Sequence, residues 1–436
     1  MKKHWVTYVF KQFERIYGFT DWGKVSYGAS DSAMVIVAKT ESNFFGTQTP
    51  FPDDFISQEW LSEEIPFLFD SEQQYPIIEV KNNQVVVNLD IVAPAFYFLS
   101  GWQEYNSPHR DSIGRFPYEA SIQKKLDIID LPVVNYYFDI LKTAIEKAFE
   151  IELKVDLWEG KETGVFLSHD IDKINSGWLE GGFNELKKGK PLSAFRVASQ
   201  RGIGKDVWFN FDDITELEKR YQATSTFFFL PEKGKYKGVN NADYSISEIK
   251  VIDSIINLNK NNYSIGLHGS YGSSFESGKL RNELQNVPVK TTTNRFHFLS
   301  WEQRLTPSIL DNSEIEKDCS LGFSEHYGYR NGMCHPFNLF DLKHDKMVKV
   351  IEYPLHLMDT TFQQKKYLNI DKLEIPKVFE KLHSEAKKFN GFTSVLWHNN
   401  FFSKYKYEGW SAVYESILAS IDKKSTAFIS LGSAKR

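Results

Sequence analysis

Two carboxylates and an imidazole stand together at the end of one apolar run. The stretch GVFLSHDIDKI, residues 164–174, passes from Val165-Phe166-Leu167 into Ser168-His169-Asp170-Ile171-Asp172. Asp and His at such a place can transfer protons or bind a divalent metal ion. The same residues can also form an acidic turn or cap a helix, which is what Asp usually does after a strand.

Further polar residues follow other short apolar runs along the chain. They are His268 and Ser270 in YSIGLHGS, Arg295 and His297 in TTTNRFHF, Asp318 in DCSLGF, and Trp397, His398 and Asn399 in TSVLWHN. A single histidine at a strand end is more often structural than catalytic. Several ionisable strand ends that meet at one rim indicate an active site.

The elements that must position these residues begin at about residue 161. Helical segments at 246–260, 371–389 and 411–422 alternate with short apolar runs. The runs are 164–172, 224–230, 263–270, 291–298, 318–323, 351–358, 393–399 and 427–431. Continuous apolar strands that alternate with helices indicate a parallel sheet with covered faces. Seven or eight of them predict a (β/α) barrel whose chemistry lies at the C-terminal ends of the strands.

Residues 1–160 show a different pattern. Strand-like pieces at 35–37, 77–80 and 85–87 are separated by turn signals, and apolar residues recur at helical spacing over 91–105 and 133–151. We therefore expect an α/β protein of two domains, a smaller α+β domain over 1–160 and the barrel over 161–436.

Composition excludes several classes of protein. The 436 residues carry a net charge of −5, which gives no overall attraction to nucleic acid. Two cysteines exclude a disulfide framework. The N-terminus lacks the apolar core of a signal peptide, and no run approaches the roughly 20 apolar residues that span a bilayer. The sequence therefore predicts a cytoplasmic protein with no transmembrane segment and leaves its oligomeric state open.

The order of the strand ends resembles the polysaccharide deacetylase superfamily, the family 4 carbohydrate esterases, over residues 161–435. SHDID is similar to the first motif of that family, GLHGSYGS to the second, RFHF to the third and VLWHN to the fifth. HDID, YRNGMCHPF, YPLHLMDTT and LWHN resemble one branch, in which an N-terminal module of unassigned function precedes the deacetylase domain. DIVAPAFYFLSGWQEY and DSIGRF, at 90–105 and 111–116, are similar to that module.

This resemblance implies hydrolysis of the N-acetyl group of a sugar, which could be free or linked to a lipid or nucleotide. Asp170 would be the general base and His398 the general acid. Arg295 would orient the base, Asp318 would orient His398, and Asp359 would be a helix cap or a supporting carboxylate. Asp172 and His268 would bind a divalent metal, with zinc the first expectation. The remaining expected substrate contacts are Ser270, His297, Trp397 and Arg330, the last of which could instead pair with a surface acid.

The sequence departs from the family pattern in three places. The second motif usually carries two histidines four residues apart, and Gly272 stands where the second is expected. His169, His297 or His326 could replace it, water could complete the site, or the site could work without metal. Ile171 separates the two aspartates, so that their roles could be exchanged. The third-motif proline of the family is His297 here.

Three functions follow from these residues. The first is a carbohydrate N-deacetylase of surface polysaccharide or glycoconjugate biosynthesis. The others are a metal-independent hydrolase of a small C–N substrate and a non-catalytic carbohydrate-binding protein. The segment 175–206 is locally basic and is either a solvated helix face or a clamp for a pyrophosphate. Its cations are Lys187, Lys188, Lys190, Arg196, Arg201 and Lys205.

Overall fold

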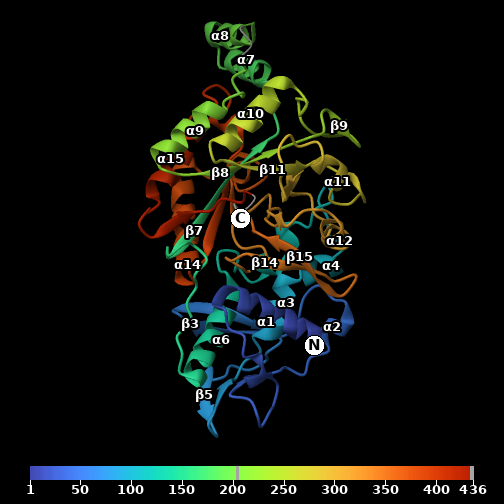
Figure 1. Ribbon diagram of the computed structural model, residues 1–436, viewed down its shortest axis with the longest axis vertical. Helices are drawn as coiled ribbons and strands as arrows, with labels where there is room; N and C mark the ends of the chain where they lie inside the picture. The colour runs from blue at the N-terminus through green and yellow to red at the C-terminus, as the bar shows by residue number, and fades with distance from the viewer. Residues whose placement is uncertain (203–205, 433–436) are drawn as a thin grey trace.

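The N-terminal part of the chain combines a small sheet with helices. We describe residues 1–202 and 206–432 of a computed structural model, with the backbone alone at residues 200–202. Helices α1 (Lys3–Tyr17) and α6 (Val133–Phe149) lie in the blue and cyan part of Figure 1. Strands β1 (Val25–Tyr27), β2 (Val35–Val37), β6 (Gln84–Val87) and β5 (Ile78–Lys81) form one sheet in that order, and β3 (Phe55–Trp60) pairs with β4 (Glu63–Leu68). The strands predicted at 35–37, 77–80 and 85–87 are present.

The helix predicted over 91–105 is instead two helices, α3 (Val92–Leu99) and α4 (Trp102–Asn106). The chain turns between them at Gly101, which has a φ of 65°. A Cβ there would lie 2.9 Å from Cδ of Gln303, and Nε2 of Gln303 donates to the carbonyl of Ser100 at 2.8 Å. Contact with a distant part of the chain therefore divides the helix, and apolar periodicity contains no signal for such a contact.

A curled sheet of ten strands dominates the second part of the described chain. The order along it is β14-β15-β13-β12-β11-β8-β7-β17-β16, and β18 pairs with β7 beside this path. Neighbouring strands are parallel except for β14 and β15. The carboxyl ends of the parallel strands therefore share one edge. The strands are β7 (Thr163–Ile171), β8 (Ser225–Phe229), β11 (Ser264–Gly269), β12 (Thr293–Phe296), β13 (Lys317–Asp318), β14 (Phe337–Asp341), β15 (Lys346–Glu352), β16 (Leu357–Met358), β17 (Phe392–Leu396) and β18 (Thr426–Phe428).

The apolar runs form strands because they are covered on both faces. Every residue of β7, β8, β11 and β17 is buried. The mixed α/β class is confirmed, but the sheet is a half-barrel where a closed ring was predicted. Strands β14 and β16 end its path, and no strand pair joins them within the described residues. The antiparallel β14 occupies the outer edge of β15, and the run at 427–431 contributes β18 to the first residues of β7.

Helices cover the outside of this sheet (Figure 1). Helices α10 (Ile249–Lys260), α14 (Ile375–Lys388) and α15 (Trp410–Ser420) match three predicted segments, and α9 (Phe211–Arg220) precedes β8. The segment from 175 to 206 contains two helices, α7 (Gly177–Lys187) and α8 (Pro191–Gly202), which stand out at the top of Figure 1. The side chains of Arg201 and Lys205 lie outside the described residues. Among the helices described, none has the length and apolar content required to cross a bilayer.

The two parts of the chain share one continuous hydrophobic core. The Tyr8 hydroxyl in α1 donates to the carbonyl of Asn338 in β14 at 2.6 Å, and the Tyr8 ring lies 5.0 Å from that of Phe340. Strand β14, the outermost strand on one side of the sheet, therefore faces the N-terminal part. A domain boundary near residue 160 remains a prediction.

Candidate active site

Strand β7 brings the carboxylates of the opening motif to the edge of the sheet. Side chains alternate along a strand, so that Ser168, Asp170 and the following Asp172 share one face and His169 lies on the other. Nδ1 of His169 is 2.7 Å from the carbonyl O of Trp397, and its Nε2 is 3.0 Å from Oε1 of Glu218. His169 is fully buried in these contacts. It is therefore a core residue and does not replace the missing metal ligand.

Arg295 in β12 holds Asp170. Its Nη1 donates to Oδ1 of Asp170 at 3.0 Å and to Oγ of Ser168 at 2.8 Å. Its Nε donates to the carbonyl of Cys319 at 2.9 Å, and the guanidinium lies 4.5 Å from the Phe228 ring centroid. Arg295 is fully buried and Asp170 is 2% exposed. A charge-assisted hydrogen bond in such a place fixes the position of the carboxylate.

Asp172, His268 and His297 turn their potential ligand atoms toward one another. Oδ1 of Asp172 lies 3.3 Å from Nε2 of His268 and 3.4 Å from Nδ1 of His297. The two ring nitrogens are 3.2 Å apart. All three atoms lie within 4.8 Å of one another. Burial alone disfavours the charge of Asp172, but the neighbouring imidazoles hold the pKa of this carboxyl well below its usual range.

Contacts on the far side of each ring decide which nitrogen is free. Nδ1 of His268 lies 2.8 Å from the carbonyl O of Arg295, and Nε2 of His297 lies 3.1 Å from that of Asn240. A carbonyl only accepts, so in a neutral ring the proton is on this nitrogen and the opposite nitrogen presents a lone pair. Oδ1 of Asp172 is buried without a hydrogen-bond partner within the described part of the chain. Three lone pairs that meet at one point fit a divalent cation, and two imidazoles with one carboxylate are a donor set of catalytic zinc sites.

Gly272 cannot supply the third ligand. Its φ is 105°, a conformation that a side chain with a Cβ rarely adopts. A Cβ there would also lie 2.8 Å from Cε1 of Tyr236. His297 arrives from the neighbouring strand instead, because β11 and β12 pair with His268 opposite Arg295 and His297 is two residues further along. Among the three histidines considered from the sequence, His297 joins the cluster.

His398 follows β17 and is held by Asp359. Nδ1 of His398 lies 2.7 Å from Oδ1 of Asp359, and the backbone N–H of His398 donates to Oδ2 at 2.6 Å. Its Nε2 lies 3.8 Å from Oδ2 of Asp172. Burial by itself lowers the pKa of His398, but the nearby carboxylates outweigh this effect and raise the pKa to about 10. The ring therefore retains a proton that it can donate inside the site.

Asp318 does not contact His398, which corrects the role expected from the sequence. Asp318 is fully buried in β13, where it accepts hydrogen bonds from Nδ2 of Asn294 at 2.6 Å and from the N–H of Ser320 at 3.0 Å. Burial raises its pKa. Asp359 takes the expected place because β16 pairs with β17, which sets Met358 opposite Leu396 and brings the residues after them together. The sequence shows both carboxylates but not this pairing.

Arg330 is also not a substrate contact. It is 2% exposed, and its Nε and Nη2 each donate to a carboxylate oxygen of Glu104 at 2.7 Å. Nη1 donates to the carbonyl of Gly322 at 2.8 Å. Arg330 therefore joins the two parts of the chain through a buried ion pair. Its partner is an acid, as one alternative from the sequence expected, but this acid is buried in the N-terminal part and does not lie on the surface.

Two more expected substrate residues, and one alternative ligand, lie away from the site. Oγ of Ser270 is buried and accepts the N–H of Glu232 at 3.3 Å. Trp397 is fully buried beside the ring of Tyr414, at 5.7 Å between centroids. His326 lies against the ring of Tyr118 at 4.2 Å. Of the four expected substrate contacts, His297 alone is among the residues that line the cavity described next.

A cavity of about 320 Å³ lies over these groups. This volume is in the usual range for a site that holds a small molecule. Ionisable side chains line its floor, and aromatic rings form part of its wall. The ionisable side chains are those of Asp170, Asp172, His268, His297 and His398. The aromatic rings are those of Phe298, Tyr367, Phe401 and Tyr407.

Arg115 brings the N-terminal part of the chain into this cavity. Its Nη1 donates to the carbonyl of Phe298 at 2.6 Å, and its Nη2 donates to the hydroxyl of Tyr367 at 3.3 Å. The same nitrogen lies 2.7 Å from Oδ2 of Asp111. The sequence contains Arg115 in the stretch DSIGRF, but no local signal placed that stretch at the site.

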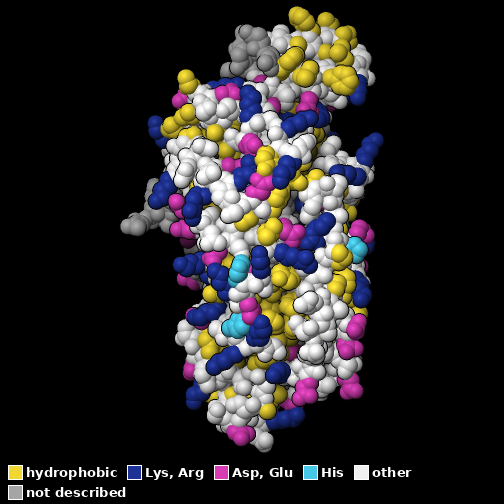
Figure 2. Space-filling model, turned by 90° about the vertical axis from the view of Figure 1, so that its right-hand side faces the viewer, with side chains coloured by type: hydrophobic (Ala, Val, Ile, Leu, Met, Phe, Trp, Pro, Cys, Tyr) yellow, Lys and Arg dark blue, Asp and Glu magenta, His cyan; other side chains and the backbone are white. Residues whose placement is uncertain are grey.

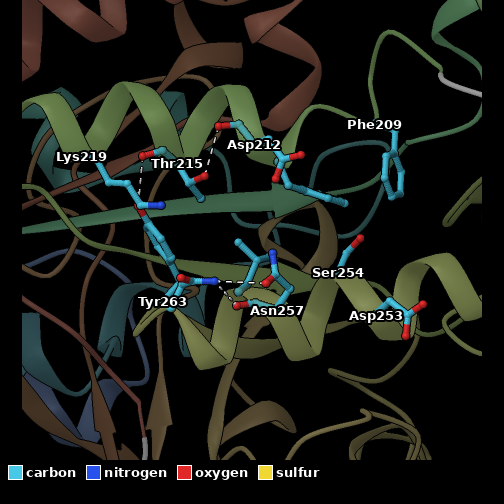
Figure 3. Close-up of a pocket in the computed structure, with 11 residues that line it drawn as sticks. Phe209, Asp212, Thr215, Lys219, Asp253, Ser254, Asn257 and Tyr263 are labelled. Atoms are coloured by element: carbon cyan, nitrogen blue, oxygen red, sulfur yellow. Dashed lines mark hydrogen bonds between the residues drawn. The ribbon is translucent and has the colours of Figure 1, made fainter.

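A second cavity, of about 340 Å³, lies between α9 and α10 (Figure 3). Its polar groups are largely engaged with one another. Oγ1 of Thr215 donates to the carbonyl of Asp212 at 3.1 Å, and the Tyr263 hydroxyl donates to the carbonyl of Thr215 at 3.2 Å. Histidine is absent from the described residues that line it. The ionisable cluster described above lies in the first cavity.

Comparison with protein families gives a match in the N-terminal part of the chain. Residues 3–150 match the model of a family of unknown function, DUF7033. No curated protein matches the sequence. The second part of the chain is defined by its own geometry, as a mixed α/β half-barrel with an Asp-His-His cluster and a carboxylate–histidine pair in one cavity.

Solved structures with some likeness include three deacetylases. A structure described as a polysaccharide deacetylase from Mycobacterium smegmatis is 15% identical, with a TM-score of 0.39 over 64% of this chain and 90% of that one. A polysaccharide deacetylase from Bacillus cereus is 11% identical, with a TM-score of 0.29 over 63% and 94%. A peptidoglycan N-acetylglucosamine deacetylase is 10% identical, with a TM-score of 0.29 over 64% and 92%. Likeness at this level assigns no function to this chain.

Proposed function

We propose that the protein is a metal-dependent carbohydrate N-deacetylase, which removes the acetyl group from an N-acetylated sugar during the synthesis of a surface polysaccharide or glycoconjugate. The observation that carries this proposal is the convergence of three units on one cavity. These are a carboxylate fixed by a buried arginine, a set of three ligand atoms, and an imidazole with a raised pKa. Amide hydrolysis needs a base, an electrophile and an acid, and each unit can supply one of them.

Asp170 is the general base in this proposal. Arg295 orients its carboxylate through a charge-assisted hydrogen bond, so that the carboxylate can accept a proton from the attacking water. The water oxygen bonds to the carbonyl carbon of the acetyl group. The bond between that carbon and the sugar nitrogen then breaks, and His398 gives its proton to the nitrogen. The products are acetate and a sugar with a free amine.

Asp172, His268 and His297 would hold the divalent cation. When bound, such an ion lowers the pKa of a water molecule and polarises the substrate carbonyl. The carbonyl groups of Arg295 and Asn240 fix the two imidazoles for this task. Aromatic side chains in the cavity wall, including Tyr367 and Tyr407, offer a flat surface with a polar edge for a sugar ring.

The test is acetate release by the full-length protein. N-acetylglucosamine oligomers and a nucleotide-linked N-acetylated sugar are incubated with the zinc-loaded protein, and acetate is measured. Asp170→Asn and His398→Gln should each lower kcat by about 10²–10⁴-fold. Asp213→Asn and His109→Ala are the matched controls, because both residues are exposed outside the cavity.

Two results would replace this proposal with one of its alternatives. Full activity in the presence of a strong chelator would favour a metal-independent hydrolase of a C–N bond. Binding of these sugars without release of acetate would favour a carbohydrate-binding protein. Equal activity of Asp170→Asn and the unmodified protein would remove Asp170 from the role of base.

A further inference from the structure

Helices α7 and α8 form a hairpin that follows directly on the strand bearing Asp170. The small residues of α7 face α8, where a Cβ on Gly181 would lie 3.4 Å from Cγ1 of Val197 and one on Gly182 would lie 3.7 Å from the carbonyl O of Ala194. Val197 and Ala194 are buried in this contact. The outer faces of both helices remain exposed beside this contact.

Large apolar side chains occupy those outer faces. On α7 they recur at the spacing of one helix face, and on α8 they lie three residues apart. Leu192 and Phe195 are 86% and 75% exposed, which places them among the most exposed hydrophobic residues described. The other members of this apolar surface are Leu179, Phe183 and Leu186, each more than half exposed. Figure 2 shows hydrophobic side chains gathered at this end of the molecule. Apolar surface concentrated in this way marks a binding face.

Positive charge surrounds the apolar surface. The turn between the helices reads Lys188-Gly189-Lys190, and residues 186–199 contain four cations and no carboxylate in a chain of net charge −5. Lys188 lies 3.2 Å from Glu408, whereas Lys187, Lys190 and Arg196 have no ion pair within the described residues. All four cations are exposed.

We infer that the α7–α8 hairpin docks the protein on an anionic lipid surface. Leu and Phe side chains enter the boundary between headgroups and acyl chains, and the surrounding cations bind the negatively charged headgroups. Charge complementarity favours this occupant over another protein. The cations lie beside the apolar side chains at the tip of the hairpin, where a bilayer meets both at once.

The hairpin is braced on the wall of the catalytic cavity. Lys173 at the cavity lies 2.8 Å from Glu180 of α7, and Nδ2 of Asn184 donates to the carbonyl of Tyr405 at 2.8 Å. Tyr407, two residues further along, lines the cavity. Docking therefore holds the cavity close to the lipid surface. The docking itself does not rest on the proposed reaction.

The experiment is flotation of the full-length protein with vesicles. One set contains phosphatidylcholine alone, and the other contains added phosphatidylglycerol. The protein should float with the anionic set at low salt and be released as salt increases. Leu192→Ser with Phe195→Ser should weaken the partition by at least about tenfold. Serine at Lys187, Lys190 and Arg196 should weaken it by about fivefold for each residue, on anionic vesicles only.

Matched controls separate these effects from a general change of surface. Ile249→Ser with Leu373→Ser removes two apolar side chains of equal exposure, 78% and 79%, from other helices. Serine at Lys260, Lys290 and Lys365 removes three exposed cations elsewhere. Both controls should float like the unmodified protein, and circular dichroism should show the same fold for every variant.

Three results would overturn the inference. The first is equal flotation with neutral and anionic vesicles, and the second is unchanged flotation of the hairpin variants. The third is self-association in light scattering that Leu192→Ser with Phe195→Ser abolishes, without vesicle binding, which would make a second copy of the chain the occupant.

Discussion

His297 provides one of three ligand atoms of the proposed metal site. Its removal should therefore lower the affinity of the protein for the metal. In the His297→Ala variant, Asp172 after β7 and His268 in β11 keep their places, because neither strand depends on the lost ring. His268 keeps its contact with the carbonyl of Arg295 at 2.8 Å. The fold should therefore be unchanged, but only two of the three metal-ligand atoms should remain.

The size of the effect follows from the number of donors. Zinc bound by four protein ligands contributes roughly 10–16 kcal/mol, or about 2.5–4 kcal/mol for each ligand. Removal of His297 should then weaken zinc binding by about 10²–10³-fold. His268 and Asp172 would retain the remaining zinc affinity, since Nε2 of His268 lies 3.3 Å from Oδ1 of Asp172.

The assay is competition between the protein and a chromophoric chelator for zinc, which reads affinity without any turnover. His326→Ala is the matched control, because His326 was an alternative ligand from the sequence but lies against Tyr118 away from the cluster. Gly272→His in the His297→Ala background should not restore binding, because Gly272 has a φ of 105° and its Cβ position is occupied by Tyr236.

Unchanged zinc affinity in His297→Ala would refute the assignment of His297 as a ligand. Restored affinity in the double variant would show that the second-motif position reaches the metal after all. A loss of affinity in His326→Ala equal to that in His297→Ala would mean that the loss reflects stability and not ligation.

Three further predictions concern other ionisable residues. Asp359→Asn removes the carboxylate that helps to raise the pKa of His398, so the alkaline limb of the kcat profile should move to lower pH by about 1–3 units, and an unchanged profile would contradict the pairing. Arg330→Met leaves Glu104 buried without its partner and should lower the free energy of unfolding in urea by about 3–5 kcal/mol, whereas a double variant that also carries Glu104→Leu should recover most of this loss. Burial and a neighbouring carboxylate raise the pKa of Asp70 to about 7, so its proton stabilises the folded state at low pH and this stability is lost as pH rises through about 7. Asp70→Asn should therefore remove about 2 kcal/mol of the fall in unfolding free energy between about pH 5 and pH 8 in urea titrations, and an identical fall in both proteins would count against it.

The strand-end residues were predictable because their signal is local. Asp170, Asp172, His268 and His398 each follow an apolar run, and a parallel sheet necessarily gathers such positions at one edge. The structure brings all four to one cavity. Their roles in a reaction remain proposals.

The contacts that depend on strand order could not be predicted in this way. Asp318 begins one predicted strand and Asp359 follows another. The pairing of β16 with β17 selects Asp359 as the partner of His398. Arg330 has an ordinary surface pattern in the sequence, and its partner Glu104 is 226 residues away. Competing tertiary contacts of this kind leave no trace in local periodicity.

Arg115 has a consequence for how variants of this protein are interpreted. It lies in the segment that matches a family of unknown function, yet it borders the cavity that holds the ionisable cluster. If the cavity binds the substrate as proposed, a substitution near residue 115 will alter substrate selectivity without changing any residue of the half-barrel. A protein that consists of residues 161–436 alone would lack this wall of the cavity, and its Arg330 would lack the carboxylate of Glu104. The smallest unit that would carry the proposed activity after recombination or cloning is the combination of both parts.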